Sequence, residues 1–249
     1  MTITVPLRRS FGRGTDGLRP IEIEPNVLPH AEGSAMIKVG DTHVLCAATI
    51  DEQVPRWMKG SGTGWVTAEY SMLPRSTKER TKREAVEGHQ KGRTVEIQRL
   101  IGRSLRAVVD MEALGERQII LDCDVIQADG GTRCASITGA YVALALACDR
   151  LLASHAIKAS PLKAAVAAVS VGVINGIPML DLDYSEDSKA DVDANIVMTD
   201  RNAFVEIQGT AEHDPFTQDT LDVILRLASG GLQDLFAAQQ SALDAARSA

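Results

Sequence analysis

The sequence predicts a single α+β domain, and three observations lead to this prediction. The first third of the chain has the pattern of strands and turns, with apolar and polar residues alternating at 21–24 as in a half-buried strand. Through the middle, apolar residues recur every three or four positions, which is typical of amphipathic helices. The second half repeats the order of strands followed by a helix, which suggests a duplicated unit, although no residue-level repeat is visible.

Three strands are predicted in the N-terminal third. Residues 21–24, Ile-Glu-Ile-Glu, alternate apolar and polar side chains as a half-buried strand does. Residues 34–39 and 43–50 form two further strands, and Gly40-Asp41-Thr42 between them is typical of a hairpin turn. The glycine-rich residues 56–64 are then expected to form a loop.

Two helices are predicted in the middle of the chain. The first runs from Thr94, which suits an N-cap, to about Ala113. Its apolar residues follow helical spacing: Ile97, Leu100, Ile101, Leu105, Val108 and Val109. After a strand at residues 119–128, a long helix opens near Arg133. Its many small residues, mostly alanines together with Ser136 and Gly139, would let it lie close against a sheet.

The second half is expected to contain four strands and one helix. The strands are residues 164–174, 179–184, 195–198 and 203–208, and the helix runs from Thr217 to about Arg247. Asn175-Gly176 between the first two strands is a strong hairpin signal. Gly230-Gly231 is expected to interrupt the helix.

The composition bounds the class of protein. The chain has 249 residues, of which 45% are apolar and 24% are charged, as in an average soluble protein. This composition excludes a disordered, collagen-like or coiled-coil protein. No interdomain linker is visible, so residues 1–249 are expected to form one domain. Apolar stretches at 139–148 and 164–174 fall short of the roughly 18 residues of a membrane span. No signal peptide is visible, and the four scattered cysteines fit free thiols in a cytoplasmic protein.

The charge is distributed unevenly. The net charge is −7, but residues 75–106 hold ten Lys/Arg against four Glu, so this stretch is +6 and the remainder is −13. Within it, residues 75–91 lack apolar periodicity and are expected to form a mobile, exposed loop. Residues 181–200 hold seven carboxylates and only Lys189 as a cation. A basic stretch favours a polyanionic partner, and the acidic one suggests that the same site also handles a cation.

The acidic residues allow two interpretations. Asp181 and Asp183 are expected on one strand face, and Asp191 and Asp193 on another, so like charges would gather. Convergent carboxylates favour a hard cation such as magnesium or manganese. The other interpretation is a solvated acidic surface. The spacing does not match a calcium-binding EF-hand, which needs Gly and Glu where Glu186 and Val192 stand.

An anion site is predicted where a strand meets a helix, at Gly130-Gly131-Thr132-Arg133. Glycines allow close backbone approach, the first N–H groups of a helix are free, and its dipole favours negative charge. Arg133 would add a bidentate donor. Arg93 stands at the second helix start, and Arg99, Arg103 and Arg106 share one face. The alternatives are an ordinary glycine turn and a solvated arginine face.

Other catalytic classes lack support in the sequence. The five histidines show no triad or metal-ligand spacing, and no G-x-S-x-G motif is present. Gly12 to Gly17 matches a dinucleotide-binding pattern, but Pro20 and the strand after it preclude the helix that such a motif must open.

Several long segments together resemble the bacterial ribonuclease PH family, over about residues 18–216. They are residues 64–75 (GWVTAEYSMLPR), 92–103 (GRTVEIQRLIGR), 121–133 (LDCDVIQADGGTR), 180–187 (LDLDYSED), 190–195 (ADVDAN) and 204–212 (FVEIQGTAE). The resemblance implies two βαβα units of the ribosomal protein S5 domain 2-like class. It would make residues 1–249 one ribonuclease PH domain, with a boundary between its halves near residues 155–163.

The resemblance also implies an activity. Enzymes of this family use inorganic phosphate to remove 3′-terminal nucleotides of tRNA as nucleoside diphosphates, and the reverse addition is possible, so they are also tRNA nucleotidyltransferases. It implies a homohexamer built as a trimer of dimers and dependence on Mg²⁺ or Mn²⁺. Other structured RNA, including ribosomal RNA precursors, would be further substrates.

Site residues are carried over by position. Phosphate binding falls on Arg93, Gly131, Thr132 and Arg133. Metal binding and catalysis fall on Asp187 and Asp193. RNA binding falls on Arg75, Arg80 and Arg83. The alternative functions are a non-catalytic RNA-binding subunit of an exosome-like ring and a hydrolytic nuclease.

The chain departs from the family pattern at three places. Gln90-Lys91 precedes Gly92, His213-Asp214 follows the Thr-Ala-Glu run, and the arm before Gly12 differs from the usual short opening. None of these positions is one of the carried-over site residues.

Overall fold

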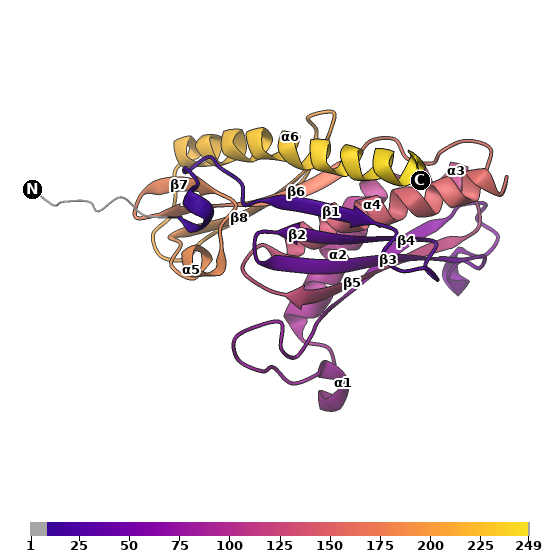
Figure 1. Ribbon diagram of the computed structural model, residues 1–249, viewed down its shortest axis with the longest axis horizontal. Coiled ribbons are helices and arrows are strands. Elements are labelled where there is room, and N and C mark those ends of the chain that lie inside the picture. Colours follow the sequence, from indigo (N-terminus) through magenta and orange to yellow (C-terminus); the bar gives the residue numbers. More distant parts are fainter. Residues whose placement is uncertain (1–8, 249) are drawn as a thin grey trace, which may run out of the picture.

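The computed structural model describes residues 9–248, and the predicted α+β class is confirmed in them. The arm before Gly12 therefore lies largely outside the described residues. Two sheets and the long helices α2, α4 and α6 make up the body (Figure 1). A five-stranded sheet has the order β1-β2-β3-β5-β4, and a four-stranded sheet has the order β7-β6-β8-β9.

The first sheet contains five strands, of which one was not predicted. They are β1 (Ile21–Pro25), β2 (Gly33–Val39), β3 (Thr42–Asp51), β4 (Trp65–Met72) and β5 (Gln118–Gln127). The missed strand is β4, which alternates buried and more exposed residues and pairs in parallel with β5. The 3-10 turn η2 (Arg56–Met58) lies within the predicted loop at residues 56–64.

The second sheet forms the other half of the molecule. Its strands are β6 (Val166–Ile174), β7 (Ile177–Leu180), β8 (Val192–Thr199) and β9 (Phe204–Ala211). All pairings in it are antiparallel. The Asn175-Gly176 hairpin is confirmed, with both residues at positive φ.

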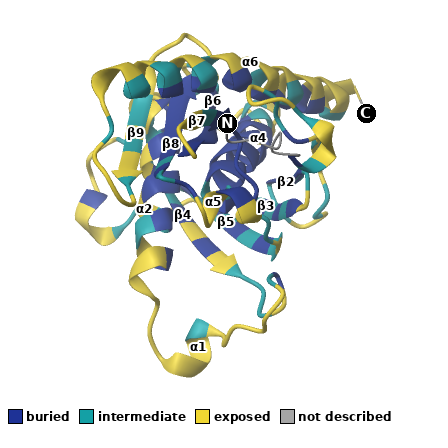
Figure 2. Ribbon diagram, turned by 90° about the vertical axis from the view of Figure 1, so that its left-hand side faces the viewer, coloured by how far each residue is buried: buried dark blue, intermediate teal, exposed yellow. Residues whose placement is uncertain are grey.

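Helix α4 (Thr132–Ala153) lies at the centre and contacts strands of both sheets. Figure 2 shows it surrounded by other elements and buried along most of its length. Gly139 explains the close packing, since a Cβ there would lie 2.7 Å from Ile37 Cγ2 and 2.9 Å from Cys46 Sγ. The predicted role of small residues is therefore confirmed at this position.

Helix α4 is also long and apolar enough, by length and composition, to cross a membrane, which the sequence expectation missed. In this structure 83% of its most apolar window is buried inside the protein, as the core helix of a folded domain would be. It is the one such helix among residues 9–248.

The remaining helices differ from prediction at their ends. Helix α2 (Gly92–Ala107) starts two residues earlier, with Lys91 as N-cap, and Thr94 instead donates a hydrogen bond of 2.6 Å to Glu84 Oε1. The helix ends before α3 (Met111–Leu114), which Asp110 caps by accepting from two backbone N–H groups. The short helix α1 (Glu84–Glu87) lies in the predicted loop at 75–91.

Helix α6 (Gln218–Ser248) runs without a break across the second sheet and β1, so the predicted interruption at Gly230-Gly231 is wrong (Figure 1). Gly231 is buried because the helix packs closely there: a Cβ would lie 2.6 Å from Leu180 Cδ2 and 3.3 Å from Leu18 Cδ2. Gly230 faces open space, and a Cβ added to it would meet nothing within 4 Å. Close packing, and not the end of a helix, explains why residue 231 is a glycine.

Two alanine substitutions on this helix are expected to act in opposite directions. Gly230→Ala should raise the free energy of unfolding by about 0.5–1 kcal/mol, because alanine loses less backbone entropy in a helix. Gly231→Ala should leave the protein about 1–3 kcal/mol less stable than Gly230→Ala, because the buried Leu180 and the partly buried Leu18 must move. Urea unfolding followed by circular dichroism measures both. Equal stabilities would contradict the packing explanation.

Candidate phosphate and RNA site

The predicted anion site lies between β5 and α4. Gly131 is the N-cap of α4 and, like Gly130 before it, has positive φ (64° and 77°). Gly130 is also closely packed, since a Cβ there would lie 2.6 Å from the carbonyl oxygen of Leu182. Within residues 9–248 no side chain caps this helix start, which leaves its first N–H groups available to an anion.

Thr132 and Arg133 complete this helix start, and other side chains orient both. The Thr132 hydroxyl lies 2.9 Å from the Tyr70 hydroxyl, and both residues are buried. Arg133 Nη1 donates to Gln208 Oε1 at 3.1 Å and to Glu96 Oε1 at 3.4 Å. The guanidinium is therefore held by elements from both halves of the chain, α2 and β9.

Arg93 lies in the first turn of α2 and is exposed. The charges of Arg93 and Arg133 both lower the pKa of the Tyr70 phenol, against the larger effect of burial, which raises it. The same two arginines act on the carboxyls of Asp187 and Asp193. The structure thus brings together the residues that the sequence predicted for phosphate and for metal.

The two candidate metal-binding aspartates come from the second half. Asp187 ends α5 (Tyr184–Asp187), and Asp193 is the second residue of β8. Burial raises the pKa of both carboxyls. For Asp193 the charge of Asp187 raises the pKa further, whereas Arg93 and Arg133 oppose the rise at both positions. Among the described residues, Asp193 Oδ1 is buried without a hydrogen-bond partner.

A divalent cation fits these two carboxylates. A hard cation would give the buried Asp193 Oδ1 a partner, and it would reduce the repulsion between the two carboxylates. No cluster of three or more His, Cys, Asp or Glu suited to a metal occurs within residues 9–248. Two carboxylates suffice for Mg²⁺, which usually keeps several waters and takes further oxygens from substrate phosphate.

The other acidic residues do not form the expected strand faces, and this prediction is wrong. Asp181 follows the end of β7 with φ of 53° and pairs with Arg19 at 2.7 Å. Asp183 is the N-cap of α5, in a capping box with Glu186. Glu186 in turn pairs with Arg9 at 2.7 Å. Arginine side chains, rather than a metal ion, neutralise this part of the cluster.

The predicted RNA-binding arginines Arg75, Arg80 and Arg83 all lie on the segment between β4 and α2, most of which is exposed. This segment, which includes α1, projects away from the body in Figures 1 and 2. Its exposure is confirmed, and its mobility stays a prediction. Because the segment leaves the body and returns at the start of α2, it ends beside Arg93.

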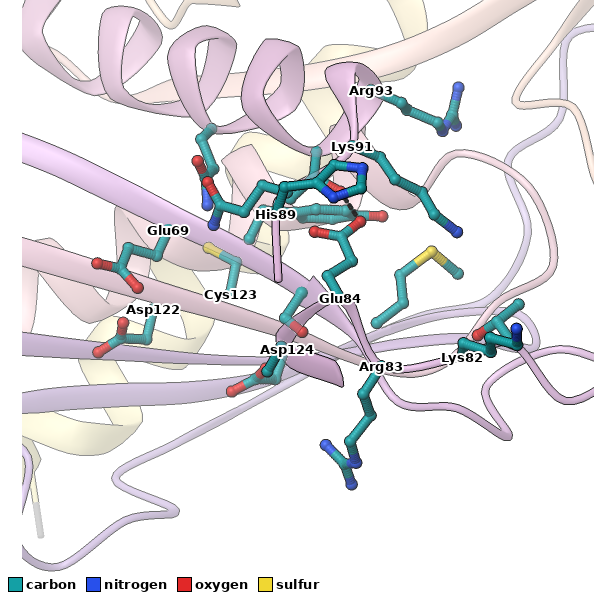
Figure 3. Close-up of a pocket in the computed structure, with 18 of the residues that line it drawn as sticks. Glu69, Lys82, Arg83, Glu84, His89, Lys91, Arg93, Asp122, Cys123 and Asp124 are labelled. Carbon is teal, nitrogen blue, oxygen red and sulfur yellow. Dashed lines mark hydrogen bonds between the residues drawn. The ribbon is translucent and has the colours of Figure 1, made fainter. Parts of the chain in front are cut away.

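A cavity of about 720 Å³ lies under this segment, beside the anion site rather than over it. Its lining includes Tyr70, Arg83 and Arg93 and the outward-facing carboxylates Asp122 and Asp124 of β5. Figure 3 shows the carboxylates on the sheet, with Lys91 and Arg93 at the start of α2. Burial raises the pKa of both aspartates. Because carboxylates line this cavity as well as cations, the helix start and its arginines suit an anion better.

The shared arginine face of α2 has mainly structural contacts. Arg103 Nε donates to Glu206 Oε2 at 2.5 Å, which ties α2 to β9. The Arg106 guanidinium lies 4.5 Å from the centre of the Trp65 ring and donates to the Val66 carbonyl. Arg103 is exposed too but is paired with Glu206, so Arg99, which is exposed and makes no ion pair within residues 9–248, fits the solvated-face interpretation best.

Sequence reasoning missed four residues of the site. Tyr70 and Gln208 orient Thr132 and Arg133, Glu212 adds negative charge near Asp187 and Asp193, and Arg19 borders the glycine turn. Tyr70, Gln208 and Glu212 stand inside the segments that resemble the family, which was the available signal. Arg19 stands outside those segments and gave none.

Comparison with known proteins identifies close relatives. Residues 17–148 match the first domain of the 3′ exoribonuclease family and residues 164–231 match its second domain. Proteins called ribonuclease PH from Neisseria meningitidis serogroups C and A are each 60% identical over 236 residues. The matches cover 95% of this chain and 98% of those proteins.

Two solved structures share the fold at low sequence identity. Rice (Oryza sativa) Rrp46 has a TM-score of 0.75 at 19% identity, covering 94% of this chain and 100% of that one. An Archaeoglobus fulgidus exosome with RNA bound to the active site has a TM-score of 0.76 at 21% identity, covering 94% and 91%. The two family domains and the close relatives carry the assignment: this chain belongs to the 3′ exoribonuclease family.

Proposed function

We propose that this protein is a phosphate-dependent 3′-5′ exoribonuclease that trims the 3′ ends of tRNA and releases nucleoside diphosphates. One observation carries the proposal. The charges of Arg93 and Arg133, two residues at helix starts that suit an anion, act on the carboxyls of Asp187 and Asp193, which suit a cation. The close relatives called ribonuclease PH support it.

Phosphorolysis needs a nucleophile that is held in place and compensation of the charge that develops during transfer. An oxygen of inorganic phosphate attacks the phosphorus of the terminal diester, and the bond to the 3′-oxygen of the preceding nucleotide breaks. The terminal nucleotide leaves as a diphosphate, and the shortened RNA gains a 3′-hydroxyl. Phosphate is itself a nucleophile near neutral pH, so no activated serine or histidine is needed.

Arg93, the N–H groups at the start of α4, the Thr132 hydroxyl and Arg133 would hold the attacking phosphate. The Tyr70 hydroxyl orients Thr132, and Gln208 orients Arg133. Asp187 and Asp193 would hold Mg²⁺ or Mn²⁺. With such an ion bound, these carboxylates would place positive charge where the leaving 3′-oxygen becomes negative.

Arg75, Arg80 and Arg83 would bind the RNA backbone. Contacts from arginine to phosphate oxygens position a nucleic acid without reading its bases. Their place on a projecting segment that ends at Arg93 fits a path for RNA towards the phosphate site.

The assembly and location follow as parts of the same proposal. We propose a homohexamer in which exposed apolar residues of β9, such as Phe204 and Ile207, are covered by another copy. We propose a cytoplasmic location, which the four free and buried cysteines support. Residues 1–249 would act as one domain, with the two family matches as its halves.

The test is degradation of a tRNA precursor with and without inorganic phosphate, with identification of the released nucleotide. Phosphorolysis requires phosphate and yields nucleoside diphosphates. Nucleoside monophosphates formed without phosphate would indicate a hydrolytic nuclease. Binding of RNA without any breakdown would indicate a non-catalytic ring subunit.

Arg133→Ala is expected to lower phosphorolysis by about 10²–10³-fold, because one donor to the transferring group is lost. The KM for phosphate should rise, whereas binding of tRNA should persist. Arg99→Ala is the control, since Arg99 is exposed elsewhere on α2. An unchanged dependence of the rate on phosphate concentration would remove Arg133 from the phosphate site.

Asp187→Asn and Asp193→Asn are each expected to nearly abolish turnover and to weaken binding of Mn²⁺, because an anionic ligand is lost. Thermal unfolding checks that the fold persists, and Mn²⁺ binding is measured by electron paramagnetic resonance. Asp234→Asn, on the exposed side of α6, is the control. A variant that keeps full activity at low magnesium identifies a residue that is not a ligand.

Replacing Arg75, Arg80 and Arg83 together by Gln should weaken tRNA binding at every sequence tested. The slope of log affinity against log salt should fall by roughly 2 to 3, because three fewer counterions are released. Phosphorolysis of a very short RNA should change much less. A variant with Lys158, Arg201 and Arg226 replaced by Gln makes the same change of charge elsewhere on the surface. If both triple variants bind tRNA alike, the segment has no specific role.

A further inference from the structure

The candidate site is divided between the two halves of the chain. The phosphate-binding turn, residues 129–131, follows β5 of the first sheet, and the acidic segment, residues 181–187, follows β7 of the second. The two segments touch directly. A Cβ on Gly130 would lie 2.6 Å from Leu182 O, and Tyr184 N donates to Asp129 Oδ1 at 3.4 Å.

Arg19 is buried between these two segments, with its side chain 1% exposed. Its Nη2 donates to Asp181 Oδ1 at 2.7 Å, and its Nε and backbone N donate to Asp181 Oδ2 at 3.0 and 2.8 Å. Its Nη1 donates to the carbonyl oxygen of Asp129. One guanidinium therefore binds a carboxylate of the acidic segment and the backbone of the phosphate-binding turn.

Thr42 extends the same contact. Its hydroxyl accepts from Arg19 Nη1 at 3.4 Å and from Asp129 N at 2.9 Å, and it donates to Gly130 O at 2.7 Å. The turn is thus held by three neighbouring hydrogen bonds. Because buried charges are costly unless fully bonded, displacement of the acidic segment would leave Arg19 and Asp181 unpaired. Displacement of the turn would leave Arg19 Nη1 without its carbonyl acceptor.

We propose that Arg19 is a positioning residue that sets the phosphate-binding turn against the segment that carries Asp187. This rests on the proposed function, since it assigns Arg19 to the geometry of phosphate binding. The planar fork of arginine can reach both partners at once, whereas a lysine ammonium is a single point of charge. The positive φ of Asp181 (53°) is a strained backbone conformation, which these contacts stabilise.

Arg13 offers a matched control. Its side chain is also buried, at 4% exposure, and belongs to the same ionic cluster. Its contacts are with the acidic segment, through Asp181, Asp183 and Glu186, with the end of β7 and with its own arm. Arg13→Lys therefore disturbs the cluster without removing a hydrogen bond to the turn.

The experiment compares the parent, Arg19→Lys and Arg13→Lys by calorimetric binding of inorganic phosphate, by the separate KM values for phosphate and RNA, and by thermal unfolding. Arg19→Lys should weaken phosphate binding and raise the KM for phosphate by about tenfold or more, as loss of a supporting contact does elsewhere. Its KM for RNA should stay near that of the parent. The phosphate affinity of Arg13→Lys should also stay near that of the parent, even where its stability falls.

If Arg19→Lys does not fold, a second variant tests the role of Arg19. Asp181→Asn keeps the shape of the side chain and the guanidinium but loses the charge that locks Arg19, so phosphate binding should weaken severalfold. Unchanged phosphate affinity in the folded variant, or equal losses in Arg19→Lys and Arg13→Lys, would overturn the role of Arg19.

The outcomes separate this inference from the proposed function. If the parent binds phosphate but degrades RNA equally well without it, phosphorolysis fails, while the binding data still decide the role of Arg19. If the parent does not bind phosphate at all, both are overturned.

Discussion

The packing of α4 between the two sheets is the constraint on which the rest of the structure depends. A helix with large side chains would hold the sheets apart, whereas Gly139 and its small neighbours let β2 and β3 approach the helix closely. Because the body of α4 is fixed in the core, its N-terminus is fixed as well. The free N–H groups at the start of α4 therefore point at one place, next to the second sheet.

Electrostatic compensation then divides the acidic residues by role. Asp181, Asp183 and Glu186 are bonded to Arg9, Arg13, Arg19 or the start of α5, so they hold the chain in place. Asp187 and Asp193 lie within the influence of Arg93 and Arg133 and keep raised pKa values through burial. Full pairing makes the first group structural, and incomplete pairing leaves the second group available for a ligand.

Prediction from the sequence was strongest where the pattern is local. Alternation identified β1, the turn at residues 40–42 identified the β2–β3 hairpin, the Asn-Gly pair identified the β6–β7 hairpin, and apolar spacing identified α2. Prediction was weakest where a local signal has two physical causes. Gly230-Gly231 was interpreted as a helix break, but Gly231 is required by packing against Leu180. The strand β4 was missed, although its side chains alternate between buried and more exposed sides.

The order of amino acids alone was enough to predict the α+β class and the glycine turn before α4. Through resemblance to a known family it also gave the residues proposed for phosphate, metal and RNA. These features depend on residues that are neighbours in the chain. Folding in three dimensions was needed to show which acidic residues are neutralised, that Tyr70 and Gln208 orient Thr132 and Arg133, and that Arg19 joins the two halves. Arg19 and Asp181 are 162 residues apart, and a contact over that separation leaves no periodicity or motif in the chain.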